Sequence, residues 1–175
     1  MISRETSLIE LAFIVCDHLK NHQIIAVLTG GSAVSVYTQN RYQSSDLDFV
    51  SSASHKQIAA AVQKLGFRTR GRIFQHPENS LTLDFPSGPL AVGDEILVTW
   101  QTLTKNNDTL YILTPTQSVK DRLASYFYYD DLQCLDQAVW VAQAQAVDLA
   151  ELESWSEREK NTKKFQDFIH KLDPD

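Results

Sequence analysis

Two aspartates, Asp46 and Asp48, stand on either side of a leucine in the segment DLDFV, where polar and apolar side chains alternate. Side chains of a β-strand point alternately to its two faces, so a strand here places both carboxylates on one face, with Cα atoms about 7 Å apart. Two carboxylates at this spacing can share one or two hard divalent cations, and Mg²⁺ keeps coordination positions for water and substrate phosphates. The pattern therefore predicts a site for Mg²⁺ (or Mn²⁺), although a solvated strand face has the same pattern.

A glycine-rich turn lies sixteen residues upstream of this pair. Gly30, Gly31 and Ser32 follow the apolar run IIAVL, and a short helix over AVSVYTQ is expected after them. Glycines remove side-chain bulk, so backbone N–H groups at the start of the helix can approach a phosphate, whose charge the helix dipole favours. The Ser32 hydroxyl supplies a further donor. On its own the turn is also ordinary loop sequence, but a phosphate cradle beside a metal-binding pair is what nucleotidyl or phosphoryl transfer requires.

Two divalent cations need more negative charge than two aspartates supply, so a third carboxylate is expected on a neighbouring strand. Asp84 is the candidate, because it lies at the far end of the apolar segment SLTLDF, which Pro86 terminates. Asp94 and Glu95, which follow the next loop, are competing candidates. A plain turn residue before the Pro-Ser-Gly-Pro segment is the alternative for Asp84.

Apolar periodicity predicts a mixed α/β order of elements around these residues. A capping box at Ser7 and Glu10 opens a helix over 7–21, and Gly66 ends another helix over 54–65. We expect strands over 24–28, 46–50, 72–76 and 80–85, a hairpin of EILVTW and TLYILT around KNND, and helices over 116–129, 131–148 and 155–171, with a second possible capping box at Ser156 and Glu159. The predicted fold class is α/β (α+β): a small mixed β-sheet core flanked by helices over 1–114, and a C-terminal helical region packed on it over 115–175.

Composition limits the function classes. The 175 residues are 43% hydrophobic, which is enough for a core, and the net charge of −6 argues against coating long DNA or other long nucleic acid, which requires a basic face. No apolar run approaches the about 18 residues of a membrane span, and MISRETSLIE has no apolar signal core. The chain is predicted to be soluble and cytoplasmic. Cys16 and Cys134 each fall inside a helical pattern and are expected to be buried.

The segment GGSAVSVYTQNRYQSSDLDF resembles the signature of the DNA polymerase β-like nucleotidyltransferase superfamily, in which a glycine-serine helix precedes Asp-x-Asp and a later third Asp. Within it, the chain is most similar to small bacterial AbiEii/MenT-like and related uncharacterised proteins. They share an Arg and a Ser just before the Asp pair, which correspond to Arg41 and Ser44. The resemblance implies that Asp46, Asp48 and Asp84 are the metal ligands and catalytic residues.

Members of the toxin branch also carry a lysine on a later helix, followed by an acidic residue. The segment TPTQSVKDRLASYFYYDDLQCLDQA is similar, with Lys120 as the lysine and Asp131, or else Asp136, as the acid. The resemblance implies that Gly30, Gly31, Ser32, Arg41, Ser44 and Lys120 bind nucleotide. The alternative for Lys120 is a solvated helix face that it shares with Asp121 and Arg122.

The function implied is Mg²⁺-dependent transfer of a nucleoside monophosphate from an NTP to a hydroxyl acceptor, which could be tRNA or a protein. A toxin-like enzyme would have an antitoxin partner. The alternative is a catalytically silent nucleotide-binding or scaffold module of the same fold. Arg68, Arg70 and Arg72 alternate along the chain, and either steer a triphosphate or an RNA end, or form a solvated edge that prevents aggregation.

Overall fold

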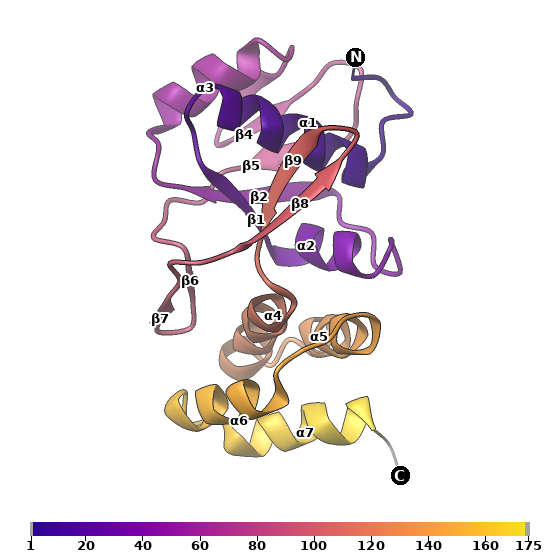
Figure 1. Ribbon diagram of the computed structural model, residues 1–175, viewed down its shortest axis with the longest axis vertical. Helices are drawn as coiled ribbons and strands as arrows, with labels where there is room; N and C mark the ends of the chain where they lie inside the picture. The colour runs from indigo at the N-terminus through magenta and orange to yellow at the C-terminus, as the bar shows by residue number, and fades with distance from the viewer. Residues whose placement is uncertain (1, 174–175) are drawn as a thin grey trace.

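The computed structural model describes residues 2–173 as a mixed sheet with helices on both sides (Figure 1). The helices are α1 (Leu8–Asn21), α2 (Gly30–Tyr37), α3 (His55–Gln63), α4 (Pro115–Tyr129), α5 (Leu132–Ala144), α6 (Leu149–Arg158) and α7 (Thr162–Leu172). The strands are β1 (Ala26–Thr29), β2 (Asp46–Ser51), β3 (Arg68–Arg70), β4 (Ile73–Gln75), β5 (Thr82–Asp84), β6 (Ala91–Val92), β7 (Glu95–Ile96), β8 (Gln101–Lys105) and β9 (Asp108–Ile112). The predicted α/β fold class is confirmed.

Seven of the strands form one sheet in the order β3-β4-β5-β2-β1-β9-β8, and β6 and β7 form a separate hairpin. The central pair β1 and β2 is antiparallel, whereas β2 with β5 and β1 with β9 are parallel. The strand β2 therefore lies between β1 and β5. This arrangement places the Asp-x-Asp strand beside both the strand that leads into the glycine turn and the strand that carries Asp84.

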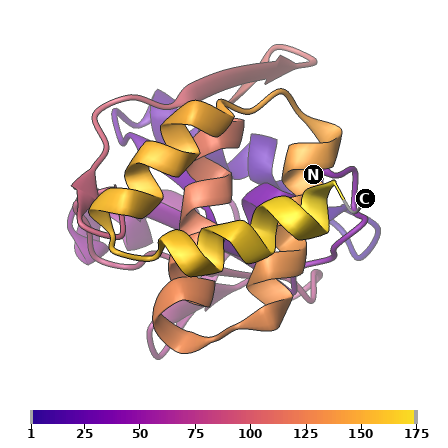
Figure 2. The ribbon, with the colours of Figure 1, turned by 90° about the horizontal axis from the view of Figure 1, so that it is seen from below.

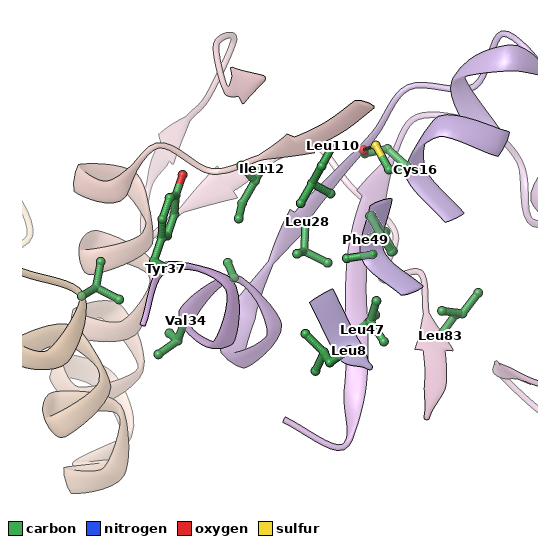
Figure 3. Packing of buried hydrophobic residues seen from close by; sticks show 14 of the residues in the cluster. Leu8, Cys16, Leu28, Val34, Tyr37, Leu47, Phe49, Leu83, Leu110 and Ile112 are labelled. Carbon is green, nitrogen blue, oxygen red and sulfur yellow. Dashed lines mark hydrogen bonds between the residues drawn. The ribbon is translucent and has the colours of Figure 1, made fainter. Parts of the chain in front are cut away.

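Alternation along the strands divides the sheet into an apolar face and a polar face. Leu47 and Phe49 of β2 are fully buried, whereas Asp46 and Asp48 are partly exposed. Helices α1 and α3 cover the apolar face (Figure 1), and a cluster that includes Leu28, Leu47, Phe49 and Leu83 fills the space beneath them (Figure 3). Burial of this face fixes the register of the strands, because a slip by one residue would turn the carboxylates into the core.

The C-terminal helices lie on the other side of the sheet. Helices α4 and α5 pack against α2, and α6 and α7 lie across them (Figures 1 and 2). Asp130, with φ 54°, turns the chain between α4 and α5, and Asp131 caps α5 by accepting a hydrogen bond from the backbone N–H of Cys134. The division of the chain into units of 1–114 and 115–175 stays a prediction. Among residues 2–173, no helix is long and apolar enough to cross a membrane.

Several element boundaries differ from the predictions. The capping box of Ser7 and Glu10 is confirmed at the start of α1. The predicted helix over 155–171 is instead two helices, since Lys160 adopts a φ of 57° between them. Ser156 is not a cap, because it lies buried inside α6 and donates to the carbonyl of Leu152. The segment EILVTW is not one strand, and its β7 pairs with β6 rather than with TLYILT.

Candidate functional site

Three carboxylates lie together on the polar face of the sheet, because of the pairing of β1, β2 and β5. Asp48 is paired directly with Thr29 of β1 and with Asp84 of β5, and Asp46 is paired with Thr82. Directly paired residues direct their side chains to the same face, and neighbouring strands lie about 4.8 Å apart. The structure therefore brings Asp46, Asp48 and Asp84 to one face of two adjacent strands, as the sequence predicts.

The electrostatics of Asp48 reflect this crowding. Burial, together with the negative charges of Asp46 and Asp84, raises the pKa of its carboxyl to about 6, whereas Arg122 opposes the shift. The ionised form of a carboxylate is destabilised when the group lies beside two other carboxylates and is partly removed from water. Groups with such shifts concentrate at functional sites, because a cation or a proton that enters relieves the repulsion.

The glycine turn closes over this carboxylate. Gly30 has a φ of 62°, and a Cβ atom placed on it would lie 2.6 Å from Oδ2 of Asp48. A side chain at this position would therefore both strain the backbone and displace the central carboxylate. At Gly31 a Cβ atom would lie 2.8 Å from the ring of Tyr42. The two glycines let α2 begin directly against the acidic face.

Ser32 has a different position from the one predicted. Its side chain is fully buried, and its hydroxyl donates to the carbonyl of Thr29 (2.8 Å) and accepts from the backbone N–H of Asp48 (3.2 Å). The hydroxyl has no free approach to a phosphate. Instead it ties the first turn of α2 to β2 and positions Asp48, so the hydroxyl would have to leave these two hydrogen bonds to bind a nucleotide phosphate.

Of the two residues before the Asp pair, Ser44 lies at the site and Arg41 is engaged elsewhere. The Ser44 hydroxyl donates to Oδ1 of Asp46 (2.8 Å) and so orients this carboxylate. Arg41 stacks over the ring of Trp140 and donates to the side chain of Gln143 (2.9 Å), both in α5. Arg41 is exposed and would have to leave these contacts to reach a phosphate.

Lys120 is also placed away from its predicted role. Its side chain is fully buried and its ammonium donates to Glu95 (2.9 Å) and to Glu151 (2.7 Å). A buried lysine held by two carboxylates forms a structural ion pair that fastens β7 and α6 to α4, so Lys120 would have to leave both carboxylates to reach a nucleotide phosphate. The same contacts engage Glu95, so Glu95 is not the third carboxylate. Asp94, on the turn of the same hairpin, is bound through its backbone N–H to Glu159.

Asp121 and Arg122 of α4, which the sequence suggested only as part of an alternative solvated helix face, approach the site. Oδ2 of Asp121 accepts from the backbone N–H of Gly30 (3.1 Å) and from the guanidinium of Arg122 (2.7 Å). Arg122 is mostly buried and acts electrostatically on Asp48. Helical spacing could have indicated this arrangement, because Lys120 lies on the same helix stripe as the apolar residues Leu123 and Phe127. That stripe turns Lys120 inward and rotates Asp121 and Arg122 towards α2.

The donors suit a hard cation, although they are not arranged around one. Among residues 2–173, no group of three or more His, Cys, Asp or Glu side chains stands in a geometry ready to hold a metal ion. One carboxylate oxygen of Asp46 already accepts a hydrogen bond from Ser44. Carboxylate oxygens are nevertheless the ligands that Mg²⁺ and Mn²⁺ prefer, and the raised pKa of Asp48 reflects burial together with the nearby negative charges of Asp46 and Asp84. The residues present therefore fit a divalent cation in chemistry and charge.

Comparisons with known proteins identify solved structures with a similar fold. No protein-family model matches the sequence, and a search of curated proteins finds no match. Among solved structures, an antigenic nucleotidyltransferase-like protein from Paracoccidioides brasiliensis is similar with a TM-score of 0.57 and 14% identity, over 94% of each chain. ANT(2″)-Ia in complex with adenylyl-2″-tobramycin is similar with a TM-score of 0.52 and 14% identity, over 93% of this chain and 97% of the other. The chain therefore has the fold of nucleotidyltransferase-like proteins.

Proposed function

We propose that the protein is a metal-dependent nucleotidyltransferase, which moves a nucleoside monophosphate from an NTP to a hydroxyl group. One observation carries this proposal: Asp46, Asp48 and Asp84 share one face beside Gly30, where no side chain intervenes between α2 and the central carboxylate. The nucleotidyltransferase-like fold supports it. The complex of ANT(2″)-Ia contains an adenylylated aminoglycoside, which is a nucleotide joined to an acceptor, and so illustrates the reaction type on this fold.

Asp46, Asp48 and Asp84 would hold Mg²⁺ or Mn²⁺, which when bound supplies charge stabilisation for the triphosphate and the leaving pyrophosphate. Gly30 and Gly31 would allow the triphosphate to approach the first turn of α2, and Ser44 would keep Asp46 in place. Asp121 occupies the N–H of Gly30, so we expect the arriving phosphate to replace this carboxylate as the acceptor. Arg122 would then contact both the phosphate and the carboxylate of Asp121.

In the reaction, the acceptor oxygen forms a bond to the α-phosphorus, the bond from that phosphorus to the bridging oxygen breaks, and pyrophosphate leaves. The hydroxyl proton must pass to a base. Asp84 is the proposed base, because it lies on β5, on the side of Asp48 away from β1 and α2. With the triphosphate at Gly30 and the acceptor beside Asp84, the acceptor oxygen would approach the α-phosphorus from the side opposite the leaving pyrophosphate, as in-line displacement requires.

The test is to incubate the purified protein with Mg²⁺ and each labelled NTP, and to measure nucleotide binding and pyrophosphate release with candidate acceptors. Binding that requires a divalent cation, and its loss in Asp48→Asn, is the expected result. Saturable binding without any product over hours would favour the silent nucleotide-binding module. Absence of both nucleotide and metal binding would remove the proposal.

The toxin-like version of this function, with tRNA as acceptor and an antitoxin partner, is a narrower hypothesis from the sequence resemblance. The position of Lys120, buried between Glu95 and Glu151, removes one of the residues that suggested this branch. Arrest of growth on overexpression, reversed by Asp48→Asn, would support it. Growth that overexpression leaves unaffected would count against it.

A further inference from the structure

The polar face that carries the three carboxylates continues outward to the edge of the sheet. Beyond Asp84, the register pairs Ile73 of β4 with Asp84, and Arg70 of β3 with Ile73. A second row runs from Asp46 through Thr82 and Gln75 to Arg68. Because directly paired residues share a face, Arg68 and Arg70 lie on the same face as the candidate catalytic aspartates.

Side-chain contacts and burial agree with this register. Arg70 donates to the side chain of Gln75 (3.0 Å), so both side chains lie on one face. The residues that point to the opposite face, Phe74 and Leu83, are buried under α1 and α3, whereas Thr82, Ile73 and Gln75 are partly exposed. The C-terminal helices pack chiefly on α2 and leave this end of the sheet open (Figure 1).

The arginines at this edge carry positive charge that is not balanced within the described chain. Among residues 2–173, no ion pair joins Arg68, Arg70 or Arg72 to a carboxylate. All three are exposed, in a chain whose net charge is −6. An acidic protein that concentrates unpaired arginines in one place creates a local attraction for anions that the rest of its surface repels.

Two hollows are lined by these arginines, and one of them reaches the site. Arg72 and Asp84 line a hollow of about 350 Å³ together with His55, Ser51 and Ser87. Arg68 and Arg70 line a separate hollow of about 720 Å³ with Gln75, Arg4 and Glu78, so their relation to Asp84 rests on the strand register. Two strand spacings separate Arg70 from Asp84, so their Cα atoms lie about 10 Å apart. An acceptor with its hydroxyl at Asp84 therefore extends over Gln75 and Ile73 towards the guanidinium groups.

We propose that the acceptor carries phosphate: its hydroxyl lies at Asp84, and a phosphate group of the same molecule binds Arg68 and Arg70. The inference rests on the proposed nucleotidyl transfer. Arginine suits this task because its planar guanidinium binds phosphate oxygens in pairs. A nucleic acid strand with a free 3′ hydroxyl and a small phosphorylated hydroxyl compound share this chemistry, whereas a polycationic acceptor is disfavoured.

The experiment compares three acceptor probes: a short single-stranded oligoribonucleotide, glucose 6-phosphate and tobramycin, each with Mg²⁺ and labelled NTP. The proteins are the wild type, the double variant Arg68→Gln, Arg70→Gln, and a control with the same loss of charge at exposed positions elsewhere, Lys105→Gln, Lys163→Gln. Transfer kinetics, NTP binding and anisotropy of the labelled oligoribonucleotide are measured on all three.

We expect label on a phosphate-bearing probe and none on tobramycin. The arginine variant should raise KM for that probe by at least about ten-fold, with NTP affinity unchanged, while the lysine control resembles the wild type. If the oligoribonucleotide is the acceptor, the magnitude of the slope of log affinity against log salt should be smaller by about 1.4 in the arginine variant than in the wild type, since two phosphate contacts are lost. Label on glucose 6-phosphate instead identifies a small acceptor.

Label on tobramycin alone, or an arginine variant that matches the lysine control, would overturn this inference. In either case transfer of label to any acceptor by the wild type would show that the proposed nucleotidyltransferase survives with a different acceptor. A wild type that binds no NTP would instead remove the proposed function and the acceptor inference together.

Discussion

The carboxylate of Asp121 in α4 accepts a hydrogen bond of 3.1 Å from the backbone N–H of Gly30, the first residue of α2. It also holds the guanidinium of Arg122, which is mostly buried. Through this contact the C-terminal helices touch the glycine turn directly. The candidate site is therefore formed by both halves of the sequence, although all its predicted metal ligands lie in the first half.

Replacement of Asp121 by Ala should lower the free energy of unfolding by about 2 kcal/mol, because it leaves the buried Arg122 guanidinium without its charged partner. Urea unfolding measures the loss. Glu78→Ala is the control, since Glu78 pairs with Arg4 at an exposed position and should cost less than about 1 kcal/mol. Equal effects of the two substitutions would show that the contact of Asp121 with Arg122 and Gly30 is not structural.

Replacement of Asp48 by Asn should abolish transfer and yet stabilise the protein at pH 8. The folded-state pKa of Asp48, about 6, lies above the about 3.9 of an unfolded aspartate, so its ionisation disfavours folding and stability falls as pH rises through 6. The free energy of unfolding of Asp48→Asn should exceed that of the wild type by about 1 kcal/mol at pH 8, and the difference should vanish below about pH 4. Unfolding curves across this range, with the exposed Asp94→Asn as control, measure it. A destabilised Asp48→Asn protein at pH 8 contradicts the electrostatic account.

Gly30 and Gly71 offer a matched pair of glycines. Their φ angles are 62° and 63°, but a Cβ atom on Gly71 would meet no atom within 4 Å, whereas one on Gly30 would reach Oδ2 of Asp48. Alanine at either position should cost about 1 kcal/mol through backbone strain. Only Gly30→Ala should also weaken nucleotide binding, by at least about ten-fold. Titration with NTP in the presence of Mg²⁺ tests this, and equal nucleotide affinities of the two variants would show that Gly30 is not at the site.

Lys120→Met should destabilise the protein by about 1 kcal/mol, because the partly exposed Glu95 and Glu151 then lose their shared cation. Adding Glu95→Gln and Glu151→Gln should restore most of the loss. The triple variant should bind NTP as the wild type does, since Lys120 does not face the site. Nucleotide affinity lost in a stable triple variant would instead return Lys120 to the role that the sequence resemblance implies.

The sequence predicted the acidic face well, for a physical reason. Alternation in DLDFV fixes which side chains share a face, and the buried Leu47 and Phe49 leave no other orientation. Asp84 could be chosen from its place at a strand end. The pairing of Asp84 with Asp48 could not be predicted, because strand order depends on long-range packing that no local pattern encodes.

The C-terminal half was predicted less well. Helical periodicity predicts three helices over 116–171 where the structure has four. The αL residue at Lys160 that separates α6 from α7 is neither Gly nor Asn, so no turn signal marks it. The roles of Lys120, Asp121 and Arg122 depend on how α4 is rotated about its axis. That rotation is set by contacts with β7, α6 and α2, which are remote in sequence.

The most direct test of the central claim is calorimetric titration of Mn²⁺ into the protein with a non-hydrolysable ATP analogue, at pH 7.5 and pH 5. Binding should be strong at pH 7.5 and weaker at pH 5, where Asp48 is largely protonated, and it should be lost in Asp48→Asn and in Asp84→Asn. Binding of Mn²⁺ and nucleotide that survives both substitutions would contradict the claim that these carboxylates form the site.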